Sequence, residues 1–215
     1  MKPDRYRNIV LLWTLATVAG VVVGMLSILT FVAGLALEGR STALVGMVGG
    51  LAIGGGIGLA QWLVLRQHLG GVIWWILASA MGGTLGVALG LVLADALRPL
   101  FGSVLADALQ SRPDAPRVLW SSAVATGIAG AVAGICVGVA QWIVLRKEVP
   151  SAGWWMVVSG LGWMTGLSLS AALLDVGGIL VSLLLAGIVV GGTTGTLLAY
   201  LLLGGTAAAR RAAGT

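Results

Sequence analysis

Six long apolar segments constrain this chain more than any other feature of its sequence. They cover approximately residues 8–37, 43–65, 72–97, 118–145, 152–174 and 176–203. A helix of about 20 apolar residues spans roughly 30 Å of hydrocarbon. Lipid offers no partners to open backbone groups, so segments of this kind cross a membrane as helices. The sequence therefore predicts an all-α integral membrane protein with six transmembrane helices.

The scarcity of charge agrees with this prediction. Only 9% of the 215 residues are charged, and the mean hydropathy is +1.07, whereas a soluble domain carries roughly 25% charged residues. The length is that of a single membrane domain, residues 1–215. The basic start of the chain resembles a signal peptide, but the apolar run behind it is longer than the 7–15 residues of a signal sequence. We therefore expect the first segment to be retained as a helix.

An internal repeat organises the six segments into pairs. At an offset of 80, residues 54–86 match residues 134–166 without a gap, with 13 of 33 positions identical. The repeats define three helical hairpins, approximately residues 8–66, 72–146 and 152–204. We expect the hairpins to pack around a pseudo-threefold axis.

Small residues recur at fixed spacing within these helices. Each odd-numbered segment carries Trp, Ser or Thr, Gly and Gly at spacing 0, 4, 7, 11, which places them on one helix face. The predicted packing glycines are Gly20, Gly24, Gly54, Gly58, Gly82, Gly86, Gly134, Gly138, Gly162, Gly166, Gly191 and Gly195. Glycine lets helix backbones approach closely, which is how helices associate in lipid. These stripes predict close helix–helix contacts.

Charge and tryptophan placement predict the orientation. Eight of the twelve Lys and Arg residues lie at the termini and in the turns after residues 65 and 145. The positive-inside rule then places both termini in the cytoplasm, and we expect a multi-pass protein of a bacterial inner membrane. Seven of the nine tryptophans fall at the same helix ends and predict an interfacial belt: Trp13, Trp62, Trp74, Trp75, Trp142, Trp154 and Trp155.

A long connection separates the two helices of the middle hairpin. Apolar residues line one helical face of the segment at approximately residues 99–110, opposite polar residues. This pattern is typical of a helix lying on a membrane surface. It is interpreted either as a linker that covers helix ends on the outer side or as a docking surface for a partner.

The most distinctive motif is Ala-Gln-Trp-[Leu/Ile]-Val-Leu-Arg. It occurs twice, with Gln61, Trp62 and Arg66 in one copy and Gln141, Trp142 and Arg146 in the other. Each Gln lies five residues, roughly 7.5 Å of helix rise, before its Arg. One interpretation is a paired site for an anionic lipid headgroup or small anion. The other is interhelical hydrogen bonding by Gln with interfacial anchoring by Arg.

Little else in the chain indicates chemistry. His68 is the only histidine and Cys136 the only cysteine, so motifs for a metalloprotease or a cysteine-based metal site are missing. Asp95 and Asp175 each follow a tryptophan by 20 residues, roughly 30 Å, which puts them at the outer interface and not at the midplane of a proton relay. We predict a protein without enzymatic activity, metal site or nucleic acid partner. No cofactor motif is recognisable, although the tryptophans suit contact with a carotenoid or chlorin.

The Gly-x-x-x-Gly-x-x-Gln-Trp-[Leu/Ile]-Val-Leu-Arg stretches, followed by Trp74-Trp75 and by Gly153-Trp154-Trp155, carry a resemblance. With them the chain resembles uncharacterised polytopic membrane proteins of cyanobacteria and green filamentous bacteria. That resemblance implies a phototrophic host and no particular activity. Mitochondrial-type carriers also have three hairpins, but their Pro-x-[Asp/Glu]-x-x-[Lys/Arg] motif is absent here.

Two functions are consistent with these features, and a third, a membrane sensor that signals through its cytoplasmic turns, has turns of only a few residues for that purpose. The first is a membrane scaffold or accessory subunit of a larger photosynthetic or respiratory complex, with other membrane proteins and lipids as partners. The second is a carrier or binding protein for a lipid, pigment or small neutral solute, with Gln61 and Gln141 in its site.

Overall fold

The computed structural model describes residues 3–37, 42–109, 117–149 and 151–212, and these residues lie in helices or in short turns between helices. The helices are α1 (Pro3–Leu37), α2 (Thr42–Leu65), α3 (Trp74–Leu109), α4 (Arg117–Leu145) and α5 (Trp154–Ala212). Six stretches in this part of the chain are long and apolar enough to cross a membrane: Asp4–Ser27, Gly46–Leu65, Trp74–Leu93, Ala123–Leu145, Trp154–Leu174 and Val176–Gly204. The predicted all-α fold with six membrane-spanning helices is confirmed to this extent.

Helix α5 contains two of the six stretches because the chain reverses within it. Gly178 adopts φ 68° and ψ 177°, outside the helical region. A positive φ is easily reached only by glycine, which has no Cβ to clash with the backbone. The two halves then run antiparallel, and the hydroxyl of Ser170 donates a hydrogen bond to the carbonyl oxygen of Ser182. The sequence-based boundary at residue 175 is thus displaced to Gly178.

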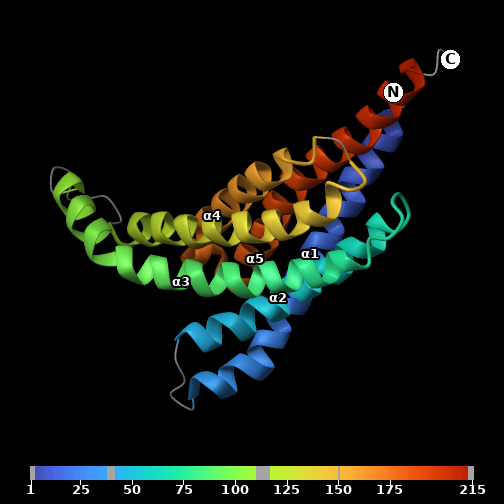
Figure 1. Ribbon diagram of the computed structural model, residues 1–215. Coiled ribbons are helices and arrows are strands. Elements are labelled where there is room, and N and C mark those ends of the chain that lie inside the picture. Colours follow the sequence, from blue (N-terminus) through green and yellow to red (C-terminus); the bar gives the residue numbers. More distant parts are fainter. Residues whose placement is uncertain (1–2, 38–41, 110–116, 150, 213–215) are drawn as a thin grey trace.

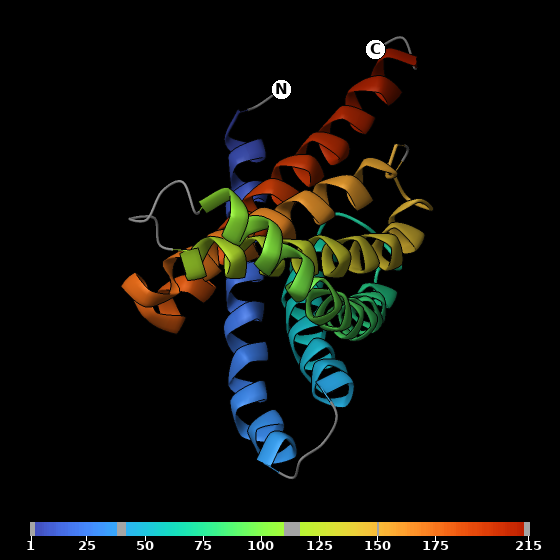
Figure 2. The same ribbon diagram turned by 90° about the vertical axis from the view of Figure 1, so that its left-hand side faces the viewer.

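The helices touch in a closed cycle (Figures 1 and 2). Each helix contacts the next in the chain, α1 with α2, α2 with α3, α3 with α4 and α4 with α5, and α5 also contacts α1. The second half of α5 provides the last contact, because Gly187 lies against Val18 and Gly191 lies against Thr14. The first and last helices of the chain are therefore neighbours.

The glycines of the sequence stripes lie at these helix contacts. A Cβ added at Gly82 would lie 2.7 Å from the Cα of Val137, and one added at Gly86 would lie 2.7 Å from the Cα of Ala133. Distances this short leave no room for a side chain, so α3 and α4 touch backbone to backbone. Gly20 lies against Ile57 in the same way between α1 and α2.

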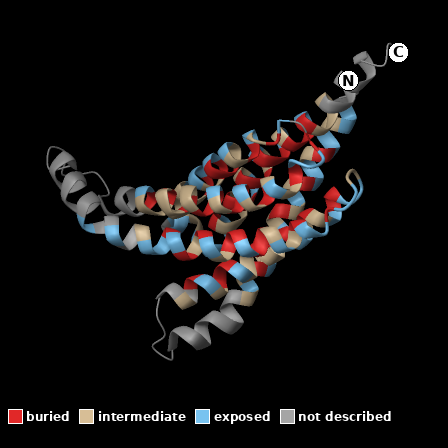
Figure 3. Ribbon diagram, in the orientation of Figure 1, coloured by how far each residue is buried: buried red, intermediate tan, exposed pale blue. Residues whose placement is uncertain are grey.

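The core lies at one end of the bundle. Its buried residues come from all six membrane-length stretches, from Ile9 and Trp13 in α1 to Leu198 and Leu201 in α5. Figure 1 shows the helices converging at the end where α1 starts and α5 finishes, and diverging toward the other end. Figure 3 shows buried residues on the inward faces and exposed ones on the outward faces. This cluster therefore lies near the helix ends that carry the repeat motif, while other buried residues, such as Ala88, Ala123 and Ala186, lie further along the helices.

The predicted surface helix at residues 99–110 is not a separate element. Helix α3 continues through Pro99 to Leu109, and Figure 1 shows its last turns bending away from the earlier ones. Proline removes one backbone hydrogen bond and bends a helix without always ending it. The helical character of the segment was predicted correctly, and its separation from the preceding span was not.

Candidate functional site

Three tryptophans, one from each repeat, meet at the centre of the converging end. Trp13, Trp75 and Trp155 are completely or almost completely buried. Their ring centroids lie 5.8, 5.8 and 5.6 Å apart, with interplanar angles of 71°, 84° and 69°. These are edge-to-face contacts, in which the positive edge of one ring meets the negative face of another. We call this group the tryptophan triad.

The triad overturns one part of the predicted interfacial belt. Trp13, Trp75 and Trp155 line the interior, whereas Trp74 and Trp154 are exposed. The physical reason is that each triad member starts the stripe of small residues that faces neighbouring helices. A tryptophan on that helix face is buried in the bundle even when it lies at the end of a membrane span. The stripe itself was the signal that could have placed it.

Both repeat glutamines bond to the triad. The indole Nε1 of Trp75 donates to Gln61 Oε1 at 3.2 Å, and Trp155 Nε1 donates to Gln141 Oε1 at 2.8 Å. Each amide nitrogen donates in turn to a hydroxyl, from Gln61 to Thr17 Oγ1 at 3.0 Å and from Gln141 to Ser79 Oγ at 2.8 Å. Each glutamine therefore links the tryptophan of one helix to the hydroxyl of another.

The third repeat completes the network with a different residue. Leu198 is buried at the position where glutamine would fall. The indole of Trp13 donates instead to Thr194 Oγ1 at 2.9 Å, and that hydroxyl donates to the carbonyl oxygen of Val190 at 2.6 Å. Sequence reasoning missed Thr194 because it lies one helical turn before the aligned position. Its hydroxyl reaches the indole from there.

The structure separates the glutamines from the arginines of the same motif. Gln61 and Gln141 are buried, and Gln141 Nε2 lies 3.5 Å from Gln61 Oε1. Arg66 and Arg146 are exposed and stack on Trp62 and Trp142, with each guanidinium carbon 5.0 Å from the ring centroid.

Two different environments thus arise from one motif. The buried glutamine amides lie in a hydrogen-bonded interior, and the exposed arginines form cation–π pairs. The contacts of the glutamines are those of the interhelical hydrogen-bonding interpretation. Binding of a headgroup by the Arg–Trp pairs stays a prediction.

A small cavity lies beside the network. Its volume is about 20 Å³, and Ser79, Gln141, Ser159 and Thr194 are among its lining residues. A cavity needs roughly 10–15 Å³ and two to four polar partners to hold a water molecule. The interior therefore has room for one water molecule beside Ser79, Gln141 and Thr194.

The remaining sequence candidates lie apart from the triad. His68 Nδ1 lies 3.1 Å from the carbonyl oxygen of Val64, one turn earlier. Among the described residues no group of three His, Cys, Asp or Glu side chains could hold a metal ion. The side chains of Asp95 and Asp175 lie outside the described part. Asp175 directly follows the span that ends at Leu174, and Asp95 lies two residues beyond the span that ends at Leu93.

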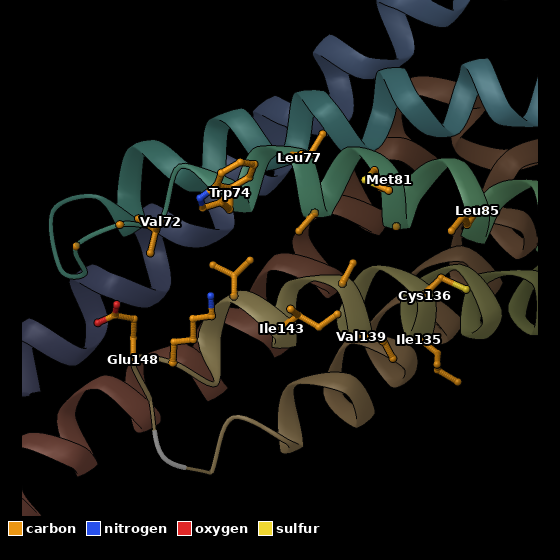
Figure 4. A pocket seen from close by; sticks show the side chains of 17 residues that line it. Val72, Trp74, Leu77, Met81, Leu85, Ile135, Cys136, Val139, Ile143 and Glu148 are labelled. Atoms are coloured by element: carbon orange, nitrogen blue, oxygen red, sulfur yellow. The ribbon is translucent and has the colours of Figure 1, made fainter.

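An apolar groove of about 660 Å³ runs between α3 and α4 on the side of the bundle. Leu77, Met81 and Leu85 of α3 line one wall, and Ile135, Val139 and Ile143 of α4 line the other (Figure 4). All six side chains are exposed to a third or more of their surface. The groove is therefore open toward the surroundings of the bundle.

Comparison with known proteins found no match among family models, curated proteins or solved structures.

Proposed function

We propose that this chain is a non-enzymatic integral membrane scaffold, an accessory subunit of a larger membrane complex. In this proposal its three hairpins pack around a pseudo-threefold axis through their Gly-x-x-x-Gly faces. The observation that supports it best is the buried network of the triad. The indoles, both glutamine amides and the hydroxyls of Thr17, Ser79 and Thr194 bond to one another. A network whose hydrogen-bonding groups have partners within the protein fixes the register of the helices. These groups are then occupied by bonds to one another.

The same network weighs against the alternative that Gln61 and Gln141 bind a small neutral solute or a pigment. Each amide already accepts one hydrogen bond and donates another. A ligand at this place would have to displace bonds to buried partners, and each buried group left without a partner costs about 1–3 kcal/mol. A carrier or binding role at these two residues is therefore the less favoured proposal.

Membrane placement is part of the proposal. The start of α1, the end of α5 and the turns after α2 and α4 lie at the same end of the bundle (Figures 1 and 2). Among the residues described there are the basic residues Arg5, Arg7, Arg66, Arg146 and Lys147. The positive-inside rule then supports an orientation with both termini in the cytoplasm, and the membrane that we propose is a bacterial inner membrane. A photosynthetic or respiratory complex is the kind of partner that we propose.

Purification of the native protein in mild detergent tests the proposal. The mass of the particle, its co-purifying chains and its absorption spectrum are recorded together. A stoichiometric complex with other membrane proteins supports the scaffold, and pigment bands would identify a photosynthetic system. A single chain that moves a solute across liposome membranes would overturn it. The double variant Gln61→Leu and Gln141→Leu separates the alternatives further, because loss of solute or pigment binding with an intact fold would favour the carrier.

A further inference from the structure

The groove between α3 and α4 differs along its length. Figure 4 shows Glu148, Val72 and Trp74 near one end and Leu85, Cys136 and Ile135 near the other. Lys147 also lines the groove, so an ammonium group and a carboxylate follow each other in the turn after α4. The rest of the lining consists of glycines, apolar side chains, Trp74 and Cys136. The groove is therefore charged at one end and apolar beyond it.

The length of the groove along the helix axis matches about half the thickness of the hydrocarbon core of a bilayer. From Trp74 to Leu85 helix α3 rises roughly 16 Å, and the hydrocarbon core of a bilayer is about 30 Å thick. Further along, Gly90 of α3 lies against Ala129 of α4, because a Cβ at Gly90 would lie 2.8 Å from the Ala129 carbonyl oxygen. A full partner helix would need a groove across the whole core. An acyl chain from one leaflet needs only this half.

We propose that the groove holds one phospholipid with a zwitterionic phosphate–ammonium headgroup. One acyl chain lies between Leu77, Met81 and Leu85 on one wall and Val139 and Ile143 on the other. Lys147 binds the phosphate, and the carboxylate of Glu148 accepts a hydrogen bond from the ammonium group. The two adjacent opposite charges complement the two charges of this headgroup, whereas an anionic headgroup would meet the carboxylate as a like charge. Exposed Trp74 stands beside the charged end, as tryptophans do at headgroup level.

This inference does not rest on the scaffold proposal. A resident lipid is compatible with a subunit of a complex and with an isolated protein. Failure of one proposal therefore leaves the other to be tested separately.

Lipid retention in nanodiscs tests the inference. The full-length protein is stripped of lipid, reconstituted with equal amounts of phosphatidylethanolamine and phosphatidylglycerol, and released into detergent for native mass spectrometry. We expect one phosphatidylethanolamine per chain to be retained in preference to phosphatidylglycerol. Met81→Trp fills the groove and should reduce retention about fivefold, which corresponds to roughly 1 kcal/mol of binding free energy.

The repeat supplies a matched control for that substitution. Leu161 occupies the equivalent position 80 residues later, outside the groove, and is 53% exposed against 55% for Met81. Leu161→Trp should leave retention unchanged. The double variant Lys147→Gln and Glu148→Gln changes residues beyond the end of α4, and it should abolish the headgroup preference while the acyl chain still binds. If Met81→Trp fails to fold, this double variant alone decides the question.

Several results would overturn the inference. They are equal retention by Met81→Trp and Leu161→Trp, an unchanged headgroup preference after both turn charges are removed, and preferential retention of phosphatidylglycerol. A dimer mass that disappears in Met81→Trp would assign the groove to a second copy of the chain. A bound pigment in the native protein with the same dependence on Met81 would assign it to that pigment.

Discussion

Adjacent tryptophans in this protein have opposite environments, so residue type alone does not decide where an aromatic side chain lies in a membrane protein. Trp74 is 64% exposed and Trp75 is completely buried. Successive helix positions differ by about 100°, so one of two neighbours can face lipid while the other faces the bundle. Trp75 lies on the face that carries Ser79, Gly82 and Gly86, and it is buried with them. The same holds for Trp154 and Trp155.

The role of the glutamines can be tested by copying the third repeat into the first. Gln61→Leu removes the acceptor of the Trp75 indole and the donor to Thr17. We expect a loss of about 1–3 kcal/mol in the free energy of unfolding, because buried polar groups lose their partners. Unfolding by denaturing detergent with circular dichroism measures it. Gln67→Leu, at an exposed position in the next turn, is the control and should stay within about 0.5 kcal/mol.

The converse substitution gives a second prediction at residue scale. Leu198→Gln restores the missing glutamine close to the hydrogen-bonding group of Trp13 and Thr194. Because the equivalent amides find partners in the other two repeats, this buried amide should find one too, and we expect a change in unfolding free energy of less than about 1 kcal/mol. Leu145→Gln, at an equally buried position of α4, should cost several times more because an unpaired amide is buried. Equal losses of unfolding free energy in both variants, measured by the same assay, would contradict the equivalence of position 198 with Gln61 and Gln141.

At the scale of elements, one glycine determines how the last two spans are joined. Gly178 has a positive φ, and a Cβ added there would meet no atom within 4 Å. Any effect of Gly178→Ala therefore reflects backbone conformation and not crowding. We expect a loss of roughly 1–3 kcal/mol, the usual cost of holding a residue with a Cβ at positive φ and extended ψ, a conformation that is almost restricted to glycine. Thermal unfolding in detergent measures this loss.

Gly192→Ala is the matched control for that prediction. Gly192 also has open space around its Cβ position, but it lies in a regular part of α5. Alanine is preferred over glycine by about 0.5–1 kcal/mol inside a helix. Opposite signs for the two variants are expected, and a stabilising Gly178→Ala would show that the turn tolerates other conformations.

The spans could be predicted from the sequence because apolar length alone requires them. The connections between the spans could not be predicted, because their conformation depends on single residues. Gly178 reverses the chain within a continuous apolar run, and Pro99 bends α3 without ending it. Nothing in the apolar pattern distinguishes a proline that stops a helix from one that bends it. Element boundaries were accordingly predicted less well than the elements.

The candidate site was predicted in part for a similar reason. Gln61 and Gln141 stand out in the sequence because an amide in an apolar helix needs a partner. Their partners come from other helices, and the repeat spacing identifies Thr17 and Ser79 as residues on an inward face without pairing them to a particular amide. Thr194 lies one helical turn before Leu198, the position that aligns with the two glutamines, so the repeat does not identify it. Its role depends on the distance across α1 and α5, which only the packed bundle defines.

At the scale of the whole molecule, contact between the first helix and the last stretch of α5 turns a chain of hairpins into a closed bundle. Trp13 of α1 donates to Thr194 of α5, 181 residues later. Without this contact the triad would lack one of its three members, and the indoles of Trp75 and Trp155 would lose an aromatic neighbour each. Closure of the cycle and burial of the triad therefore depend on each other.

A cross-link between α1 and α5 tests this closure. A Cβ at Gly187 would lie 3.5 Å from the Cβ of Val18, within the range of about 3.5–4.5 Å that a disulfide requires. In a Cys136→Ala background, Val18→Cys with Gly187→Cys should form a disulfide under mild oxidation. With a protease site added between α3 and α4, the two halves should then stay together on a non-reducing denaturing gel and separate after reduction. Val18→Cys with Gly192→Cys should not cross-link, because Gly192 faces open space. Halves that separate without reduction in the Gly187→Cys variant would mean that α1 and α5 are not neighbours in the membrane.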